Sequence, residues 1–214
     1  MRNIFIIILI IFLYHSFNDT GIFDDYQLSK TGMKAFSVPI QKELTPEEKK
    51  LVFKVKFSGC ESTITPLYSY KIYARIYSKK HYLRAVDMMP APYDLALGWD
   101  GLEKPEVFKT IRAWQSFRWV HWMPNKDCIY SIDQIYMRLA NTHVIPANDK
   151  ILQGIKKLNK KDQIFLEGYL VSFKTTRGKT YATGYSSTTR SDRKNNSCEI
   201  MYVTRLVSKY GEFK

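Results

Sequence analysis

Three residue types in the second half of the chain could together perform nucleophilic catalysis. Cys198 supplies a thiol, His143 an imidazole base, and Asn141 an amide that could orient the base. Cysteine hydrolases need these groups, because the imidazole activates the thiol and the third group holds the ring. Glu199 and Asp192 are alternative orienting groups. The competing interpretation is that Cys198, at the start of an expected strand, is simply buried or disulfide-bonded, and spacing alone does not decide between the two.

The other cysteines, Cys60 and Cys128, form no C-x-x-C pair, so the sequence indicates neither a zinc-finger nor a dithiol redox motif. In an oxidising compartment we expect one disulfide and one free thiol, with the pairing left open. The remaining residues that could bind a metal are His81, His121, His143, Asp87, Asp94 and Asp100. None of the histidines has H-x-H or H-x-x-x-H spacing, and we therefore expect no metal and no cofactor.

Anion binding is a second kind of chemistry that the sequence suggests. Arg190, Arg193 and Lys194 lie among hydroxyl side chains in a polar stretch over residues 186–196, and they could bind phosphate or carboxylate. Arg118 and Trp122 are a further candidate, because exposed Arg and Trp side chains stack on sugars or bases. The competing interpretations are a solvated loop for the first group and core packing for the second.

The charge of the chain also favours an anionic partner. The net charge is +13, and residues 150–214 carry +9 of it, with 14 Lys and Arg against 5 Asp and Glu. Such a basic segment attracts acidic lipid headgroups, cell-wall polymers or nucleic acid. A lysine-rich solvated surface explains the same numbers. For an exported protein nucleic acid is the least expected of these partners.

Export is indicated by the first seventeen residues. Met1-Arg2-Asn3 precedes eleven apolar residues, Ile4 to Tyr14, which is the pattern of a signal peptide or signal-anchor. Eleven helical residues span roughly 16 Å, which is short for a hydrocarbon core of about 30 Å. No small-residue cleavage site follows. An uncleaved signal-anchor, a cleaved signal and a buried N-terminal helix therefore all stay open. The first two place the domain outside the cytoplasm, either membrane-anchored or secreted.

The elements that must position these side chains follow from hydrophobic periodicity. We expect a tether over residues 18–44 and one globular domain over residues 45–214. Strands are expected at 51–57, 68–76, 82–86, 116–122, 142–145, 163–174, 180–185 and 198–207, with a short helix from Thr45, one or two turns within 131–139 and a helix capped by Asn148. The fold class is therefore α+β and mainly antiparallel β, as a compact sheet or partly open barrel with one or two helices.

Four motifs carry a resemblance. They are Ala140–Ala147 (ANTHVIPA), Asp162–Val171 (DQIFLEGYLV), Thr189–Asp192 (TRSD) and Cys198-Glu199. The chain resembles, over roughly residues 65–207, a family of small uncharacterised bacterial proteins that often carry an N-terminal membrane segment. The resemblance implies a single domain and no particular activity. The stretch Asp162–Val171 also resembles an entry strand of OB-type barrels, so an OB-like fold is one form that the expected barrel could take.

Three functional hypotheses follow. The first is a membrane-tethered or exported binding or scaffold domain, whose basic face meets an anionic surface, polymer or protein partner. The second is a Cys-His hydrolase that acts on envelope material. The third, an OB-like nucleic-acid binder, requires a cytoplasmic location and therefore conflicts with the N-terminal segment.

Overall fold

The computed structural model describes residues 36–85, 87–189 and 198–214. The described part is rich in antiparallel strands. Its elements are β1 (Ile40–Lys42), a 3-10 helix η1 (Glu48–Lys50), β2 (Phe53–Phe57), β3 (Cys60–His81), β4 (Tyr93–Gly98), α3 (Pro105–Phe108), β5 (Ile111–Ser116), β6 (Trp119–Pro124), α4 (Ile132–Tyr136), β7 (Leu139–Pro146), α5 (Asp149–Lys157), β8 (Gln163–Arg177), β9 (Thr180–Tyr185), β10 (Glu199–Ser208) and β11 (Gly211–Phe213). The expected α+β class with mainly antiparallel strands is confirmed.

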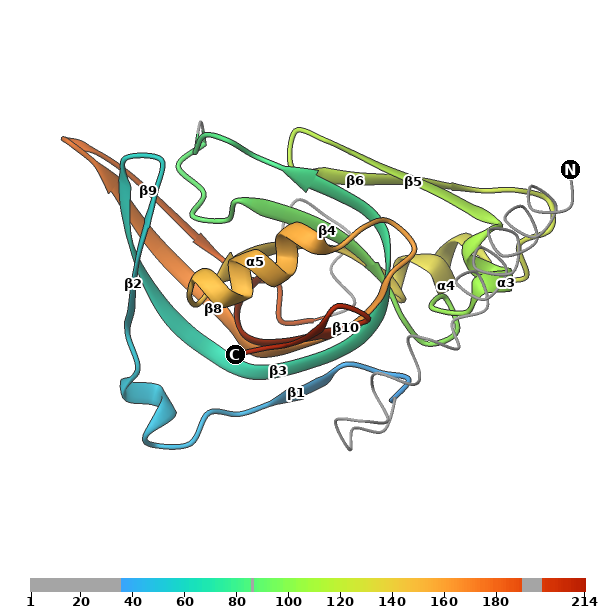
Figure 1. The fold of residues 1–214 in the computed structure, drawn as a ribbon, viewed down its shortest axis with the longest axis horizontal. Coiled ribbons are helices and arrows are strands. Elements are labelled where there is room, and N and C mark those ends of the chain that lie inside the picture. The colour runs from blue at the N-terminus through green and yellow to red at the C-terminus, as the bar shows by residue number, and fades with distance from the viewer. Residues whose placement is uncertain (1–35, 86, 190–197) are drawn as a thin grey trace, which may run out of the picture.

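The main sheet curls until five of its strands pair in a ring (Figure 1). The order is β3, β4, β7, β10 and β8, and β8 pairs with β3 again over fourteen register positions. All of these pairs are antiparallel except β7 with β10. In chain order these strands are β3, β4, β7, β8 and β10: helix α5 joins the third strand, β7, to the fourth, β8, and the third and fifth strands, β7 and β10, are the parallel pair, as in the five-stranded Greek-key barrel of OB type. The OB-like form suggested by Asp162–Val171 thus agrees with this strand order.

Apolar side chains fill the inside of the ring, because alternate residues of each strand point inward. Ile72, Leu95, Val144, Leu166 and Met201 come from the five strands and are all fully buried in one cluster. One close approach depends on a glycine: a Cβ on Gly168 of β8 would lie 2.0 Å from the carbonyl oxygen of Tyr202 in β10. Only glycine lets these two strands pair at that point.

Helix α5 lies across the mouth of the curved sheet (Figure 1). The Asn148 side chain accepts a hydrogen bond from the Ile151 backbone N–H at 3.0 Å, which caps the helix as expected. Ile151 and Ile155 point into the core, and lysines lie in the last turn. The expected start at Thr45 is confirmed as a reciprocal cap between Thr45 and Glu48, although only the short η1 follows it.

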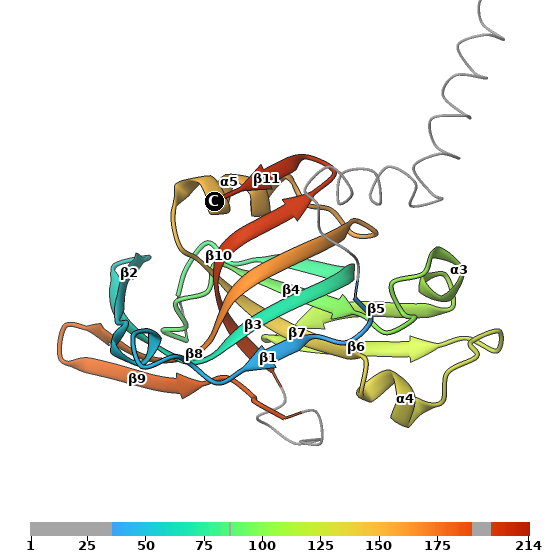
Figure 2. The same cartoon turned by 90° about the horizontal axis from the view of Figure 1, so that it is seen from below.

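A separate two-stranded hairpin, β5–β6, projects at the end opposite to β2 and β9 (Figure 2). The continuous strand expected over residues 116–122 is wrong, because the chain reverses at Phe117 and Arg118 in the middle of that stretch. Both residues have positive φ, 46° and 66°. This is the backbone of a two-residue hairpin turn, a position that Asn and Gly normally occupy. Aromatic residues alternate on both sides of the turn, and the sequence pattern therefore resembles that of one continuous strand.

Three other expectations need correction. Residues Ile40–Lys42 pair with β3 and Leu44 is buried, so the folded domain begins before residue 45 and includes the end of the expected tether. The strand expected over 82–86 is absent from its described part, Tyr82–Ala85, which forms a loop after the unusually long β3. The three cysteines are free, so the expected disulfide is wrong. They lie in three different places: Cys60 and Cys128 belong to different core clusters, and Cys198 borders a surface cleft.

The N-terminal segment over 1–17 and the tether up to residue 35 lie outside the described residues. Among the residues that are described, no helix combines the length and apolar character needed to cross a membrane. The signal or anchor hypothesis therefore stays a prediction.

Candidate active site at the start of β10

Three neighbouring strands bring Asp94, His143 and Cys198 to one region of the sheet. Asp94 of β4 is the register partner of His143 in β7, so their side chains lie next to each other on the same face. On the other side of β7, Ile200 of β10 is the register partner of His143. Cys198 comes two residues before Ile200 and precedes the first residue of β10. Cys198 and Ile200 both line the cleft that His143 faces.

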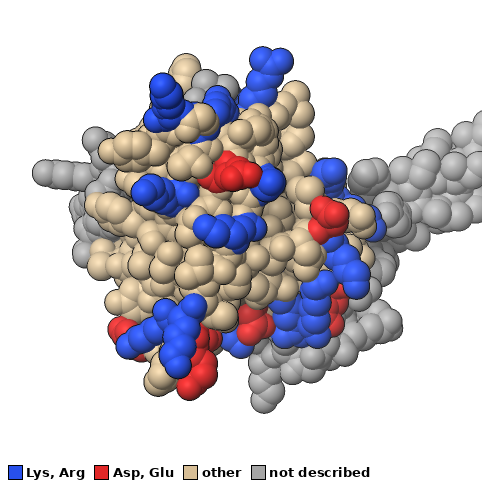
Figure 3. Space-filling model, turned by 90° about the vertical axis from the view of Figure 1, so that its left-hand side faces the viewer, with Lys and Arg blue, Asp and Glu red and all other residues tan. Residues whose placement is uncertain are grey.

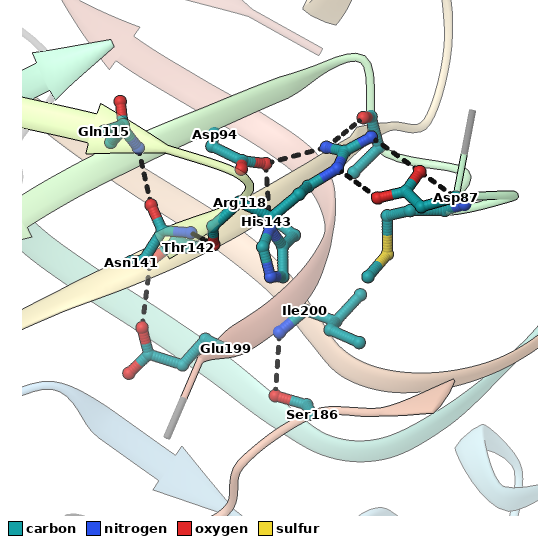
Figure 4. Close-up of polar contacts among 12 residues, drawn as sticks. Asp87, Asp94, Gln115, Arg118, Asn141, Thr142, His143, Ser186, Glu199 and Ile200 are labelled. Atoms are coloured by element: carbon teal, nitrogen blue, oxygen red, sulfur yellow. Dashed lines mark hydrogen bonds and ion pairs between the residues drawn. The ribbon is translucent and has the colours of Figure 1, made fainter. Parts of the chain in front are cut away.

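The Asp94–His143 contact is buried and short. The Nδ1 atom of His143 lies 2.8 Å from the Oδ1 atom of Asp94, and the side chains are 5% and 0% exposed (Figure 4). Burial acts to lower the pKa of His143, but hydrogen bonds with Asp94 and Cys198, together with the charges of both, outweigh it and raise the pKa to about 9. His143 is therefore an imidazolium at neutral pH. Because Nδ1 faces Asp94, Nε2 is the nitrogen left for the thiol.

His143 and Cys198 open onto a common cleft of about 370 Å³. The cleft is lined by Asp87, Met89, Arg118, Trp119, His143, Phe173, Ala182, Thr183, Gly184, Tyr185, Cys198 and Ile200. The Cys198 thiol is free and partly exposed. Its backbone is held in place, because the carbonyl oxygen of Cys198 accepts a hydrogen bond from the Ser187 backbone N–H at 3.0 Å. The Ile200 backbone N–H donates to Ser186 Oγ at 2.9 Å.

Arg118 holds the carboxylates of this site from the hairpin turn (Figure 4). Its Nη1 donates to Asp94 Oδ1 at 3.0 Å and to the Ala91 carbonyl oxygen at 2.9 Å, and its Nε donates to Asp87 Oδ2 at 2.6 Å. The guanidinium also stacks on the Tyr82 ring, 3.8 Å from its centroid. Arg118 is thus occupied by protein partners. The sequence assigned Arg118 to an external ligand, and that role stays a prediction. The positive φ of Arg118 helps to direct its side chain towards Asp94.

Asn141 does not orient His143. Its Nδ2 donates to the Arg118 carbonyl oxygen at 2.9 Å, and its Oδ1 accepts from Gln115 Nε2 at 2.5 Å. Asn141 therefore anchors the hairpin turn that carries Arg118. Asp94 takes the orienting position instead. The sequence analysis named Asp94 only as a possible metal ligand. A carboxylate within the apolar stretch Tyr93–Leu97 is buried, and a buried carboxylate needs a hydrogen-bonding or charged partner, which was the available signal.

Glu199, the other alternative orienting residue, faces the opposite side of the sheet from Cys198. Its carboxylate accepts from Thr142 Oγ1 at 2.8 Å and from the Tyr70 hydroxyl at 3.3 Å inside the ring. Successive residues of an extended chain point to opposite faces, so Cys198 and Glu199 belong to different environments despite being adjacent. Glu199 has a structural place in the interior.

The remaining candidates lie elsewhere. Trp122 is half-buried, and its ring packs edge-on against Tyr136 at 4.8 Å, so it forms no stacking surface with Arg118. Among the histidines considered as metal ligands, His81 stacks on Tyr93 and His121 contacts Ser116 at 2.7 Å. Asp100 pairs with Arg138 at 2.9 Å. The residues Arg190, Arg193, Lys194 and Asp192 lie outside the described residues.

Comparisons with known proteins add no name to this site. No protein-family model matches the chain, and neither a curated protein nor a solved structure is significantly similar to it. The resemblance to a bacterial family with an N-terminal membrane segment therefore stays a prediction, and function has to be argued from the site itself.

Proposed function

We propose that the protein is a cysteine hydrolase in which Cys198 is the nucleophile, His143 the acid–base group and Asp94 the orienting carboxylate. The observation that carries the proposal is the position of His143, which is bonded through Nδ1 to a fully buried carboxylate and shares a cleft with a free thiol. Nucleophile, base and orienting group in this sequence of contacts are the geometric signature of covalent catalysis.

The chemistry would run in two half-reactions. The Cys198 sulfur attacks the carbonyl carbon of an ester, thioester or amide, while His143 donates the Nε2 proton to the departing alcohol, thiol or amine. A thioester with Cys198 forms and the original acyl bond breaks. His143 then accepts a proton from water, the water oxygen attacks the thioester, and the released acid leaves behind the thiolate and the imidazolium. Asp94 stabilises the imidazolium form in both halves.

The cleft favours a substrate with an apolar or planar group next to the reacting carbonyl. Met89, Phe173 and Ile200 supply apolar surface, and Trp119 and Tyr185 are 40% and 62% exposed at its border. Aromatic side chains at a cleft border suit flat or apolar ligand surfaces. A substrate in the cell envelope follows if residues 1–17 export the chain.

Alkylation of the three cysteines in the purified full-length protein tests the activated thiol. We expect iodoacetamide to modify Cys198 at neutral pH at least about tenfold faster than Cys128, because Cys198 shares its cleft with His143 and a neighbouring histidine activates a cysteine as a nucleophile. Cys128 is the internal control, since it is also partly exposed, packs against the cluster around Tyr77, and has as its hydrogen-bond partner the Tyr130 carbonyl oxygen at 3.7 Å. His143→Ala should remove the advantage of Cys198 and leave Cys128 unchanged. Equal rates in the wild type would contradict the proposal.

Formation of an acyl-enzyme tests catalysis itself. With p-nitrophenyl acetate we expect a burst of nitrophenol of one equivalent per chain, and a mass increase of one acetyl group on Cys198. Cys198→Ala should abolish both signals, whereas Cys128→Ala should retain them. A burst that survives in Cys198→Ala, or acetylation confined to lysines, would rule out Cys198 as the nucleophile.

The hypothesis of a tethered binding domain with a basic face at Arg190, Arg193 and Lys194 stays a prediction, because these residues lie outside the described part of the chain. Alanine substitution of the three, followed by retention on an anionic resin at increasing salt, remains its direct test. It is compatible with a hydrolase, since a basic surface can bring an anionic substrate to the cleft.

A further inference from the structure

A second surface, which adjoins the catalytic cleft at β9, is formed by the exposed face of β2, β3, β8 and β9. We call it the platform. Alternate residues of the four paired strands point outward on this face. They are Lys54, Lys56, Glu61, Thr63, Thr65, Ser172, Lys174, Thr176, Tyr181, Thr183 and Tyr185. They comprise three lysines, five Ser or Thr residues, two tyrosines and one glutamate.

The register places these side chains in rows that cross the strands. Lys54, Thr63, Lys174 and Thr183 form the middle row, because each is the register partner of the next. Lys56, Glu61, Thr176 and Tyr181 form the row beside it. Neighbouring strands are about 4.8 Å apart, so a row of four spans roughly 14 Å.

The platform is concave along its middle. A groove of about 530 Å³ lies between β2 and β8, and Lys54, Lys56, Thr63, Lys174 and Thr176 contribute to its lining. Figure 3, which views this end of the molecule, shows lysines and arginines in greater number than carboxylates on a largely uncharged surface. Glu61, the single carboxylate of the platform, is paired with Lys56 at 2.8 Å, so Lys54 and Lys174 provide the net positive charge of the groove.

The chemistry of the platform suits a sugar polymer. Tyr181 and Tyr185 are 69% and 62% exposed on the edge strand β9, where their rings present flat surfaces. Aromatic rings of this kind stack on the apolar faces of sugar rings, and the rows of Ser and Thr hydroxyls can exchange hydrogen bonds with sugar hydroxyls. Hydroxyl residues outnumber charged ones, which favours a ligand whose own groups are mostly hydroxyls.

The charge density distinguishes this ligand from nucleic acid. Two net positive charges are spread over a surface roughly 14 Å wide, whereas a nucleic-acid strand places a phosphate on every nucleotide and is bound mainly through dense Lys and Arg contacts. Arginine is absent from the platform residues named above. A polymer with a carboxylate on every second sugar matches two lysines better.

We propose that the platform binds an anionic polysaccharide in which charged and neutral sugars alternate. The polymer would lie along the middle row, with carboxylates at Lys54 and Lys174 and a sugar ring against Tyr181. This proposal does not depend on Cys198 being a nucleophile. The two surfaces meet at β9, because Thr183 and Tyr185 also line the catalytic cleft.

Binding of a fluorescent hyaluronan oligosaccharide to the purified full-length protein tests the proposal, with fluorescence anisotropy as the measurement. Hyaluronan alternates a uronic acid with a neutral sugar. We expect the double variant Lys54→Gln/Lys174→Gln to weaken binding at least about tenfold, and Tyr181→Ala to weaken it roughly fivefold. The matched control is Lys109→Gln/Lys126→Gln, which removes the same charge from two exposed lysines beyond α3 and β6, at the end opposite to β9 (Figure 2). The control should bind within about twofold of the wild type.

Four results would overturn the proposal. The first three are the absence of hyaluronan binding by the wild type, equal weakening in the platform and control variants, and tighter binding of an oligothymidylate than of hyaluronan. The third result would assign the platform to nucleic acid instead. A neutral dextran oligosaccharide that binds as tightly as hyaluronan would also remove the role of the lysines. Alkylation of Cys198 should be unchanged in the platform variant, so failure here leaves the hydrolase test unaffected.

Discussion

Two ion pairs in this protein have the same local geometry and opposite surroundings. Asp94 and His143 are register partners on adjacent antiparallel strands, and so are Glu61 and Lys56. Both pairs have a nitrogen–oxygen distance of 2.8 Å. The side chains of the first pair are 0% and 5% exposed, whereas those of the second are 68% and 82% exposed. Any difference between the two pairs in their contribution to stability, or in the pKa of their side chains, must therefore come from their surroundings.

The buried pair is part of a network, because Arg118 binds the same carboxylate oxygen and Cys198 lies on the other side of the imidazole. Water cannot replace a lost partner there, so each member depends on the others. The exposed pair has water on all sides, and its charges are screened by salt. We therefore expect the buried pair to set the protonation state and position of its side chains, and the exposed, net-neutral pair to set neither.

The largest effect should come from Asp94→Asn. This change keeps the shape of the side chain but leaves the buried charges of Arg118 and His143 without their shared carboxylate, which should lower the free energy of unfolding by roughly 3–5 kcal/mol. The pKa of His143 should fall from about 9 towards or below its ordinary value of 6.5, since burial then acts with less opposition. Urea unfolding and NMR titration of the imidazole measure the two effects.

Asp100→Asn is the matched control for that variant. Asp100 pairs with Arg138, but both side chains are partly exposed, at 35% and 25%. We expect a loss below about 1 kcal/mol. Similar losses in both aspartate variants would show that burial does not separate the two kinds of pair.

The pH dependence of stability should report the buried pair directly. The pKa of His143 is raised in the folded protein to about 9, so protonated His143 stabilises the fold. This stabilisation is fully present below about pH 6.5 and is lost as the pH rises through about 9, with a total on the order of 3 kcal/mol. The free energy of unfolding should therefore decrease over this interval in the wild type. His143→Gln should flatten the profile and His121→Gln should not, and an unchanged slope in His143→Gln would contradict the assignment.

Arg118→Lys should have an intermediate effect of about 2 kcal/mol. A lysine keeps the charge but cannot reach Asp87, Asp94 and the Ala91 carbonyl oxygen together, because it lacks the planar fork of donors. Arg112→Lys is the control on the same hairpin, since Arg112 is exposed and its contact in the described residues is with the Trp114 ring at 5.6 Å. Thermal melting of the two variants gives the comparison. A melting temperature for Arg118→Lys equal to that of Arg112→Lys would show that the fork is not needed.

The contrast between local contacts and buried, distant ones also explains which elements could be predicted from the sequence alone. Periodicity identified β8, β9 and α5 well, because their alternation and caps are local properties of the chain. The strand expected over 116–122 failed at Phe117 and Arg118, where no Asn or Gly marks the turn. A turn in residues that normally avoid positive φ is held by distant contacts, here from Asn141 and Asp94. Such contacts have no signature in the local pattern.

The candidate site was partly accessible for the same reason. Cys198 and His143 could be chosen by residue type, but the orienting role went to Asn141, which is near in sequence, instead of Asp94, which is near in space. The parallel pairing of β7 with β10 and the antiparallel pairing of β4 with β7 create that neighbourhood. Register between strands that are far apart in the chain is set by the whole sheet, and one sequence does not reveal it.

The smallest effect should come from Glu61→Gln on the platform. The pKa of Glu61 is lowered by its hydrogen bond and charge interaction with Lys56, yet both groups are fully open to solvent, so water and salt replace the partner when it is removed. We expect no measurable change in the melting temperature. The same variant releases Lys56 to act with Lys54 and Lys174, so hyaluronan binding should strengthen slightly and become more sensitive to salt. A clear loss of stability would show that an exposed pair with good geometry behaves like the buried one, and the contrast between the two pairs would fail.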